Sequence, residues 1–152
     1  MSSSEEAGIS QALELFKMGL NTIPFNHHAG FHLVEAGLAG SRLEFAMKPE
    51  LIGNVMQQIL HGGVIAAAMD MVGGAAGIVA AFQQIPAEER KERLQRYGTI
   101  DMRVDYLRPG RGQQFTATGR VLRAGKKICV TRMELRNEAD ELIATGTGTY
   151  LF

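Results

Sequence analysis

Residues 60–82 read LHGGVIAAAMDMVGGAAGIVAAF and predict one long apolar helix. From Gly62 to Phe82 only Asp70 can ionise. A helix that is apolar all round is either surrounded by protein or inserted in lipid, and about 20 apolar residues would span a bilayer. Five glycines, a carboxylate at mid-span and the lack of Trp or Tyr at either end argue against a membrane span. We therefore expect a helix at the centre of a folded domain.

Asp70 lies on a strip of this helix that holds only glycine and alanine. At about 100° per residue, its neighbours three, four and seven positions away are Gly63, Ala66, Ala67, Gly73, Gly74 and Gly77. A strip without bulky side chains lets another backbone or a ligand come close, whereas a purely structural helix would fill the core there. The alternative is tight packing of the strip against a second copy, with Asp70 hydrogen-bonded. A buried carboxylate is costly without a use or a partner, which favours a functional Asp70.

The bulk composition is that of a neutral globular domain. The chain has 152 residues, is 45% hydrophobic and carries 16 basic and 16 acidic side chains. This size predicts one domain, residues 1–152, with a sizeable core, and the neutral charge argues against nucleic-acid binding. Cys129 is the single cysteine, so an internal disulfide is excluded and a reducing compartment is favoured. The polar, acidic first residues are unlike a signal peptide, and we expect a cytoplasmic location.

One stretch departs from this neutrality. Residues 108–127 contain no acidic side chain and six basic ones, namely Arg108, Arg111, Arg120, Arg123, Lys126 and Lys127. A local cationic run on a neutral protein indicates a small anionic partner more than a long polyanion. A solvated strand edge protected by charge would give the same pattern, and both interpretations stay open.

Along the chain, helical and strand patterns alternate around the central helix. Two more helices are predicted at 8–21 and 86–96, and a loop at 49–60. A hairpin joins 31–36 to 41–47, and a four-strand meander is expected over 100–106, 115–121, 128–136 and 142–152. In the first of these four strands the predicted buried face holds Ile100, Met102, Val104 and Tyr106. The fold class is therefore α+β, a largely antiparallel sheet curled around one helix.

Four motifs resemble a known family. They are Pro24-Phe25-Asn26, His61-Gly62-Gly63 with Asp70 nine residues after the histidine, Asp105-Tyr106-Leu107-Arg108-Pro109, and residues 144–150. Together they resemble the hotdog-fold acyl-CoA thioesterases, above all the PaaI-like (phenylacetyl-CoA-type) subfamily, from about Pro24 to Phe152. The resemblance implies a curved sheet wrapped around the central helix and hydrolysis of an acyl- or aryl-CoA. It also implies a site shared by two subunits, in a homodimer or a homotetramer made as a dimer of dimers.

The catalytic roles follow from that resemblance. Asp70 is the expected base or nucleophile, and the Gly62 N–H is the expected oxyanion donor. His61 and a polar loop residue would orient the thioester. A helix N-terminus suits the donor role, because its N–H groups are free and carry partial positive charge.

Two positions differ from the family pattern or match it loosely. The family commonly has Asn six residues before the histidine, where this chain has Val55; Asn54, Gln57 or Gln58 would then take that role. Thr99 corresponds to a Ser or Thr that some relatives place near the nucleophile. The charged helix at 86–96 is longer than the usual link and would be a lid or an insertion.

The remaining expectations concern the ligand. We predict that Gly63, Arg108, Arg123, Lys126 and Lys127 bind the substrate, the cationic ones through the CoA phosphates. No cofactor and no metal is expected, since His27, His28 and His32 lack Cys or carboxylates at ligand spacing. Two alternatives stay open: a hotdog hydratase or dehydratase that pairs Asp70 with His61, and a non-catalytic acyl-CoA-binding protein.

Overall fold

The computed structural model describes the backbone of residues 3–152 and the side chains of residues 10–152. The first two residues of the predicted domain and the first side chains of the predicted N-terminal helix lie outside these described residues.

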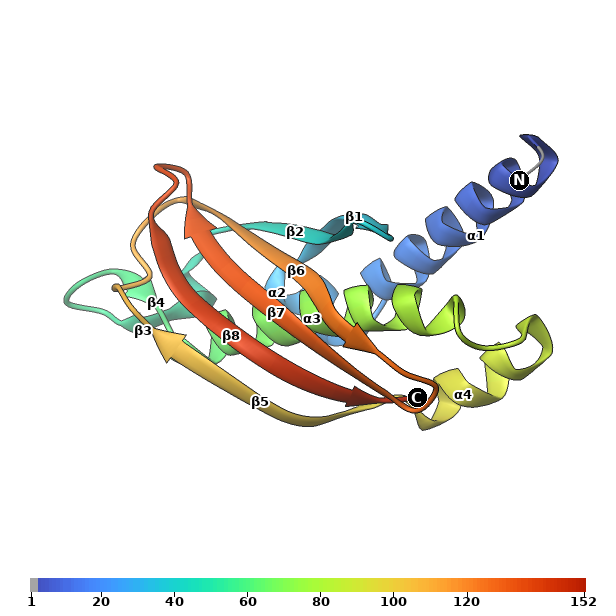
Figure 1. Cartoon of the computed structure of the whole chain (residues 1–152). Coiled ribbons are helices and arrows are strands. Elements are labelled where there is room, and N and C mark those ends of the chain that lie inside the picture. Colours follow the sequence, from blue (N-terminus) through green and yellow to red (C-terminus); the bar gives the residue numbers. More distant parts are fainter. Residues whose placement is uncertain (1–2) are drawn as a thin grey trace.

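The central helix, α3 (Gly62–Phe82), has the predicted bounds, and a curved antiparallel sheet wraps around it (Figure 1). Within residues 3–152 this sheet has six strands. In spatial order they are β1 (His32–Gly37), β2 (Gly40–Ala46), β6 (Gln114–Ala124), β7 (Ile128–Asn137), β8 (Leu142–Leu151) and β5 (Gly98–Tyr106). Every neighbouring pair is antiparallel. The predicted α+β class, with a curved sheet around one long helix, is confirmed.

The core lies between α3 and the concave face of the sheet. Side chains of a strand alternate between its two faces, and alternate residues such as Leu43 and Phe45 on β2 or Met133 and Leu135 on β7 are buried. Each such side chain contributes about 1.5–3 kcal/mol when fully buried. Twelve of the 21 residues of α3 are buried as well. The helix is long and apolar enough to cross a membrane, but here its apolar surface packs within the chain.

The predicted four-strand meander is wrong in one respect. Strands β6, β7 and β8 are joined in sequence order, but β5 pairs with β8 on the far side of the sheet. Residues 107–113 connect β5 to β6, and this connection is longer than the two to five residues typical of a hairpin. As a result β5 is an edge strand, and Ile100 and Tyr106 are 52% and 54% exposed instead of buried. A bulge between Thr99 and Asp101 interrupts the alternation at Ile100.

The loop predicted at 49–60 is partly regular. It contains a 3-10 turn, η1 (Pro49–Leu51), and a small antiparallel ribbon of β3 (Ile52–Asn54) and β4 (Ile59–Leu60). These strands are too short to show a hydrophobic period in the sequence. The ribbon ends at Leu60, directly before the N-cap residue His61, and so fixes where α3 begins.

Further helices lie outside the sheet (Figure 1). The predicted N-terminal helix is α1 (Ser3–Asn21), which packs on β1 and extends away from the sheet (Figure 1). Pro24 opens a further short helix, α2 (Pro24–Ala29), in the first-turn position that suits proline. The charged segment forms η2 (Ala87–Glu89) and α4 (Arg90–Arg96). Arg90 donates to the Phe82 carbonyl (2.8 Å), so α4 lies at the C-terminal end of α3, away from the His61 end of its own chain.

Candidate active site

The N-terminus of α3 presents one free backbone donor. His61 is the N-cap, and its Nδ1 accepts from the Gly63 N–H at 2.8 Å. The His61 N–H itself donates to the Leu51 carbonyl (2.8 Å), which ties the helix start to the 3-10 turn η1. Among the described residues nothing accepts from the Gly62 N–H. The Gly63 N–H is therefore used by the helix cap, and the Gly62 N–H remains available to a ligand.

Tyr106 covers this first turn. Its hydroxyl donates to the Gly62 carbonyl (3.0 Å), and a Cβ at Gly62 would lie 3.3 Å from the tyrosine ring. A cavity of about 380 Å³ opens beside the ring, lined by Ile59, Leu60, Gly62, Ile65, Tyr106, Leu107, Arg108, Pro109 and Gly110. The lining is mainly apolar and reaches the free N–H. The alternation in β5 predicts a buried Tyr106, but the residue lies exposed at the end of an edge strand and contacts Gly62.

Asp70 is half-buried in the middle of α3. Thr99, at the start of β5, donates its hydroxyl to Asp70 Oδ1 at 2.9 Å. The Asp70 backbone carbonyl accepts from the Tyr150 hydroxyl (3.3 Å). In the part of the chain that the structure describes, no group donates to Asp70 Oδ2. One carboxylate oxygen is thus held, and the other is open to a reactant.

Gly62 and Asp70 are too far apart to act on one group within a single chain. They are eight positions apart, which is about 12 Å along a helix axis. An oxyanion donor works at roughly 2.7–3.1 Å from the oxygen that becomes charged, and an attacking carboxylate or water must reach the carbon bonded to that oxygen. Within one chain, Gly62 and Asp70 therefore cannot both reach the same carbonyl group.

The polar loop side chains are engaged in the turn between β3 and β4. Asn54 Oδ1 accepts from the N–H groups of Met56 (3.0 Å) and Gln57 (3.1 Å). Gln58 has a positive φ of 54°, and its side-chain amide donates to the Val55 carbonyl (2.7 Å). Both side chains therefore shape the turn beside the α3 N-terminus. Their predicted contact with the thioester stays a prediction.

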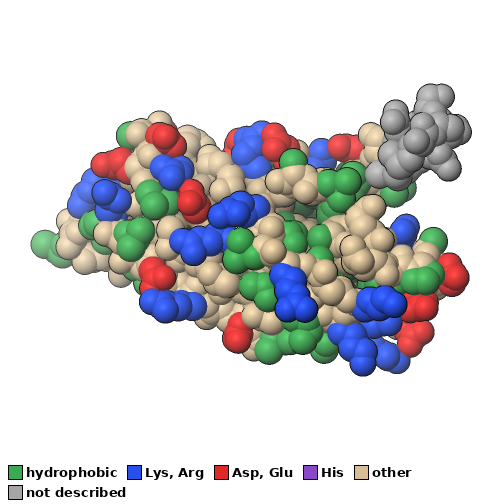
Figure 2. All heavy atoms as spheres, in the orientation of Figure 1, with side chains coloured by type: hydrophobic (Ala, Val, Ile, Leu, Met, Phe, Trp, Pro, Cys, Tyr) green, Lys and Arg blue, Asp and Glu red, His purple; other side chains and the backbone are tan. Residues whose placement is uncertain are grey.

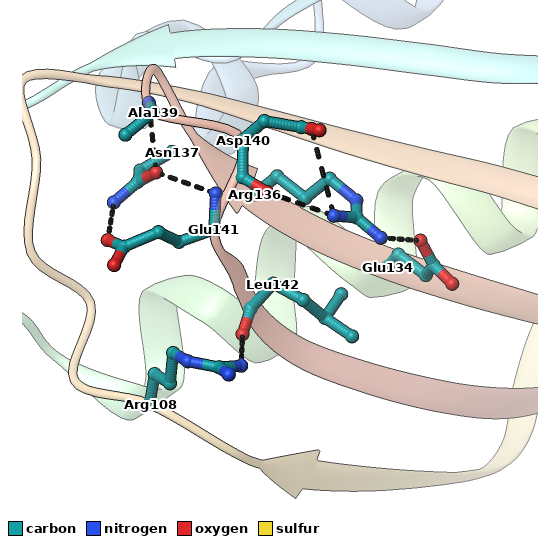
Figure 3. A network of polar contacts seen from close by, with 8 residues as sticks. All are labelled: Arg108, Glu134, Arg136, Asn137, Ala139, Asp140, Glu141 and Leu142. Carbon is teal, nitrogen blue, oxygen red and sulfur yellow. Dashed lines mark hydrogen bonds and ion pairs between the residues drawn. The ribbon is translucent and has the colours of Figure 1, made fainter.

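The predicted cationic residues lie at two ends of the sheet. Arg108 lines the cavity at the α3 N-terminus and donates to the Leu142 carbonyl (2.9 Å), beside the polar network of the β7–β8 turn (Figure 3). Lys127 lies at the opposite end, where its carbonyl accepts from the Phe152 N–H (3.0 Å). Arg123 and Lys126 lie at that same end, in or next to the β6–β7 turn. Strand β8 spans the interval, so the two groups are roughly 30 Å apart.

The visible face carries basic side chains along its whole length (Figure 2). In Figure 2 lysine and arginine side chains gather at the end of the molecule where α4 and the β6–β7 turn lie, next to acidic side chains. Other basic side chains are spread over the rest of the visible face, among acidic and apolar ones.

The glycine strip of α3 faces this chain's own sheet over most of its length. A Cβ at Gly73 would lie 2.8 Å from Thr131 Oγ1 and 2.9 Å from the sulfur of Met133. Gly77 faces Cys129 in the same way, with 3.4 Å to the sulfur. The close approach predicted from the strip is therefore made by strands β7 and β8 at Gly73, Gly74 and Gly77. Only its first part, with Gly63, Ala66 and Ala67, stays partly exposed beside Asp70.

Comparison with known proteins gives consistent matches. The thioesterase superfamily model matches residues 57–144. Two proteins named medium/long-chain acyl-CoA thioesterase YigI, from Salmonella typhimurium and Escherichia coli K12, are each 46% identical over 145 residues, covering 93% of this chain and 94% of theirs. A crystal structure of a Shewanella oneidensis protein, described as related to the thioesterase superfamily, is 47% identical with a TM-score of 0.89, covering 94% of this chain and 96% of that one.

Proposed function

Because the chain belongs to the thioesterase superfamily, we propose that it hydrolyses an acyl-CoA thioester to a free acid and CoA. The observation that carries the proposal is the Asp70 carboxylate, held by Thr99 through one oxygen and open at the other. A carboxylate placed in this way can take a proton from water or attack the thioester carbonyl itself.

Two routes use the same groups. As a general base, Asp70 takes a proton from a water molecule whose oxygen forms the new C–O bond. As a nucleophile, Asp70 forms an anhydride with the acyl group, which water then hydrolyses. In both routes the carbonyl oxygen becomes an oxyanion near the Gly62 N–H, the C–S bond breaks, and the CoA thiolate leaves and takes up a proton. One such donor contributes about 3 kcal/mol to the stability of the transition state.

The separation of about 12 Å between Gly62 and Asp70 supports a site built from two copies. Gly62 of one copy would face Asp70 and Thr99 of the other. The unpaired edge of β5, with exposed Ile100, adjoins Asp70 and offers the surface for this contact. The proposed assembly is a homodimer or a dimer of dimers.

Subunit mixing tests the shared site directly. An Asp70→Asn chain and a Gly62→Pro chain should each be inactive. After exchange of subunits, half of the dimers would be mixed, and each mixed dimer would hold one intact site. About a quarter of the parent activity should therefore return, as the two-fold symmetry requires. Light scattering should give a mass of two or four chains. A stable, active monomer, or no recovery on mixing of exchanging subunits, would overturn the shared site.

The proposed pairing of two copies would also bring the two groups of cationic residues close together. Arg108 lies at the α3 N-terminus, while Arg123, Lys126 and Lys127 lie at the Thr99 end of the sheet. If Gly62 of one copy faces Asp70 of another, these two ends approach each other. We propose that they bind the CoA phosphates from the two sides of the interface.

The acyl group is proposed from the relatives. Their identity of 46% over most of the chain supports a medium or long acyl chain, and the four motifs support the finer PaaI-like placement. A screen of free-thiol release over short, medium, long and aromatic acyl-CoAs should give the highest kcat/KM with medium or long chains. Preference for an aromatic acyl-CoA would overturn the chain-length proposal. Binding without thiol release, or hydration of an enoyl-CoA, would overturn the hydrolase.

The cytoplasmic location stays a proposal. It is supported by the single cysteine, Cys129, which is buried and unpaired. Fractionation of cells that express the chain should recover it with the cytoplasmic enzymes.

A further inference from the structure

Tyr106 has no role in the hydrolysis proposed above, although its hydroxyl bonds the first turn of α3. The hydroxyl donates to the Gly62 carbonyl at 3.0 Å. A backbone carbonyl has two lone pairs, so it can accept this bond in addition to a bond within the helix. Gly62 is also the residue whose N–H is the proposed oxyanion donor. A side chain from β5 therefore holds the residue that carries this donor.

Tyr106 itself is held on a rigid support. It pairs with Ala144 of β8, and the N–H groups of the next two residues, Leu107 and Arg108, both donate to the Ile143 carbonyl, at 2.9 and 3.1 Å. Ala144 and Ile143 are buried in the core. The end of β5 therefore has a fixed position, and it lies beside the first turn of α3 (Figure 1).

The donor lies on a stretch of chain with little rigidity of its own. Gly62 and Gly63 are the first two residues of α3, and glycine has more conformational freedom to lose on ordering than any other residue. The first N–H groups of a helix also have no carbonyl of a preceding turn to hold them. The Gly63 N–H is held by His61 Nδ1. In the described part of the chain, Tyr106 is the only residue whose side chain bonds Gly62 itself.

The tyrosine ring restrains Gly62 from the same side as the hydroxyl. A Cβ added at Gly62 would lie 3.3 Å from ring atom Cε1 and 3.6 Å from the hydroxyl oxygen. Ring and glycine both line the cavity of about 380 Å³ at the α3 N-terminus. Tyr106 thus lies against the donor residue at the place where a substrate would enter.

We propose that Tyr106 is a positioning residue for the oxyanion donor: its hydroxyl, bonded to the Gly62 carbonyl, keeps the Gly62 N–H in the orientation that meets the developing oxyanion. The inference rests on the proposed function, since it concerns the donor of that site. A donor that is already in place costs no reorganisation when the charge develops. A first turn that is free to move loses part of this advantage. The hydroxyl acts on the transition state through Gly62 and not by binding the substrate.

The first test is Tyr106→Phe, measured on the full-length protein with a medium-chain acyl-CoA. The variant keeps the ring beside Gly62 and removes only the hydroxyl of a half-exposed residue, so its melting temperature should stay near that of the parent. We expect kcat to fall about threefold to tenfold at nearly unchanged KM, the size of one hydrogen bond that matters only in the transition state. An unchanged kcat, or a raised KM at unchanged kcat, would overturn the positioning role.

Two double variants separate positioning from direct contact with the substrate. Gly62→Pro removes the N–H, so adding Tyr106→Phe to it should cause no further loss of kcat. Gly62→Ala adds the same first carbon beside the ring but keeps the N–H, and in this background Tyr106→Phe should still lower kcat about threefold to tenfold. The same further loss in both backgrounds, or in neither, would overturn the role.

Ser41→Ala is the control for a hydroxyl that only anchors the helix. The Ser41 hydroxyl also donates to a carbonyl of α3, that of Val72 (2.6 Å), but this carbonyl lies well beyond the first turn. The variant should lower the melting temperature and leave kcat near that of the parent. A fall in kcat equal to that of Tyr106→Phe would overturn the positioning role, because any anchor of α3 would then have the same effect. An Asp70→Asn protein with the turnover of the parent would overturn the proposed function itself, so the two failures are distinguishable.

Discussion

At the first turn of α3 a glycine adjoins an open cavity, whereas in the middle of the same helix glycines face the sheet. Gly62 has one near neighbour, the exposed ring of Tyr106, at 3.3 Å from an added Cβ. Gly73 has three side-chain atoms within 3 Å of an added Cβ, from Tyr150, Thr131 and Met133. The first position is half-buried and the second is buried.

The difference separates two uses of the same residue. At Gly62 the missing side chain leaves a backbone N–H open to a ligand. At Gly73 it lets the helix approach two strands more closely than any side chain would allow. Asp70 lies between these positions, with its carboxylate on the accessible side. Composition alone does not distinguish the two uses, because both read as glycine in an apolar helix.

The largest effect on turnover is expected at Asp70, which lies between Gly62 and Gly73 on α3. Asp70→Asn keeps the size of the side chain and its acceptor for Thr99 but can neither remove a proton nor attack a carbonyl at a useful rate. We expect kcat to fall at least about a hundredfold, the scale of a lost general base, with acyl-CoA binding and melting temperature near those of the parent. Turnover, titration and melting measured on one preparation check this. Normal turnover in the folded variant would remove Asp70 from the mechanism.

At the open end, a pair of variants tests the N–H of Gly62. Gly62→Pro removes the donor at the first helical position, where proline is tolerated. We expect a loss of roughly a hundredfold in kcat, the size of one oxyanion donor. Gly62→Ala adds the same first carbon beside Tyr106 but keeps the N–H, and it should lose only a few-fold. Similar losses in both variants would mean that crowding of Tyr106, and not the donor, causes the effect.

At Gly73, a substitution should change the stability of the fold and not the rate of hydrolysis. Gly73→Ala introduces a methyl group into the sheet contact and should cost about 1–3 kcal/mol of unfolding free energy. For a chain of this size the melting temperature should fall by about 3–10 °C. Gly19→Ala is the control, because Gly19 is an exposed helical glycine with nothing within 4 Å; it should be neutral or slightly stabilising. A Gly73→Ala protein as stable as the parent would contradict the close approach.

A smaller effect is expected from the cationic residues at the Thr99 end. Replacing Lys126 and Lys127 by Gln should raise KM for an acyl-CoA by about threefold to tenfold at nearly constant kcat, as loss of uniform binding does. The increase should shrink with added salt and vanish for a thioester without the nucleotide. Equal increases for both thioesters would point to structural damage.

The smallest effect is expected at Cys129 on β7, which packs against Gly77 of α3. Burial raises the pKa of the Cys129 thiol to about 11, and its side chain is 0% exposed against Gly77. At pH 8 the folded protein should therefore react with a thiol reagent only as fast as it unfolds, and completely in denaturant. Rapid labelling of the folded protein would show that the packed half opens.

The sequence was sufficient for the elements whose signals are long or repeated. A run of 21 residues from Gly62 to Phe82, in which only Asp70 is charged, defines α3, and alternation over ten residues defines strands such as β7. The contact of Thr99 with Asp70 was expected from the family resemblance and is present at 2.9 Å. The β3–β4 ribbon was missed because strands of three and two residues are too short to show a hydrophobic period.

The pairing partners of the strands could not be predicted from the sequence in the same way. The alternation from Ile100 to Tyr106 is that of a half-buried strand, but nothing local indicates that β5 pairs with β8 and ends as an edge. The misplacement of Tyr106 follows from that topology. The separation of Arg108 from Lys126 and Lys127 also depends on where the strand ends fall, although all three belong to one basic stretch of sequence.

The contact between α3 and strands β2 and β6 has a consequence for how the protein melts. The Ser41 hydroxyl donates to the Val72 carbonyl at 2.6 Å, and a Cβ at Gly119, the strand neighbour of Ser41, would lie 2.6 Å from that same carbonyl oxygen. The backbone of α3 therefore lies directly on β6 at Gly119, with no room for a side chain between them. We expect a contact this close to be kept or lost as a whole when the protein unfolds. Heat should remove structure and turnover together, in one cooperative calorimetric transition.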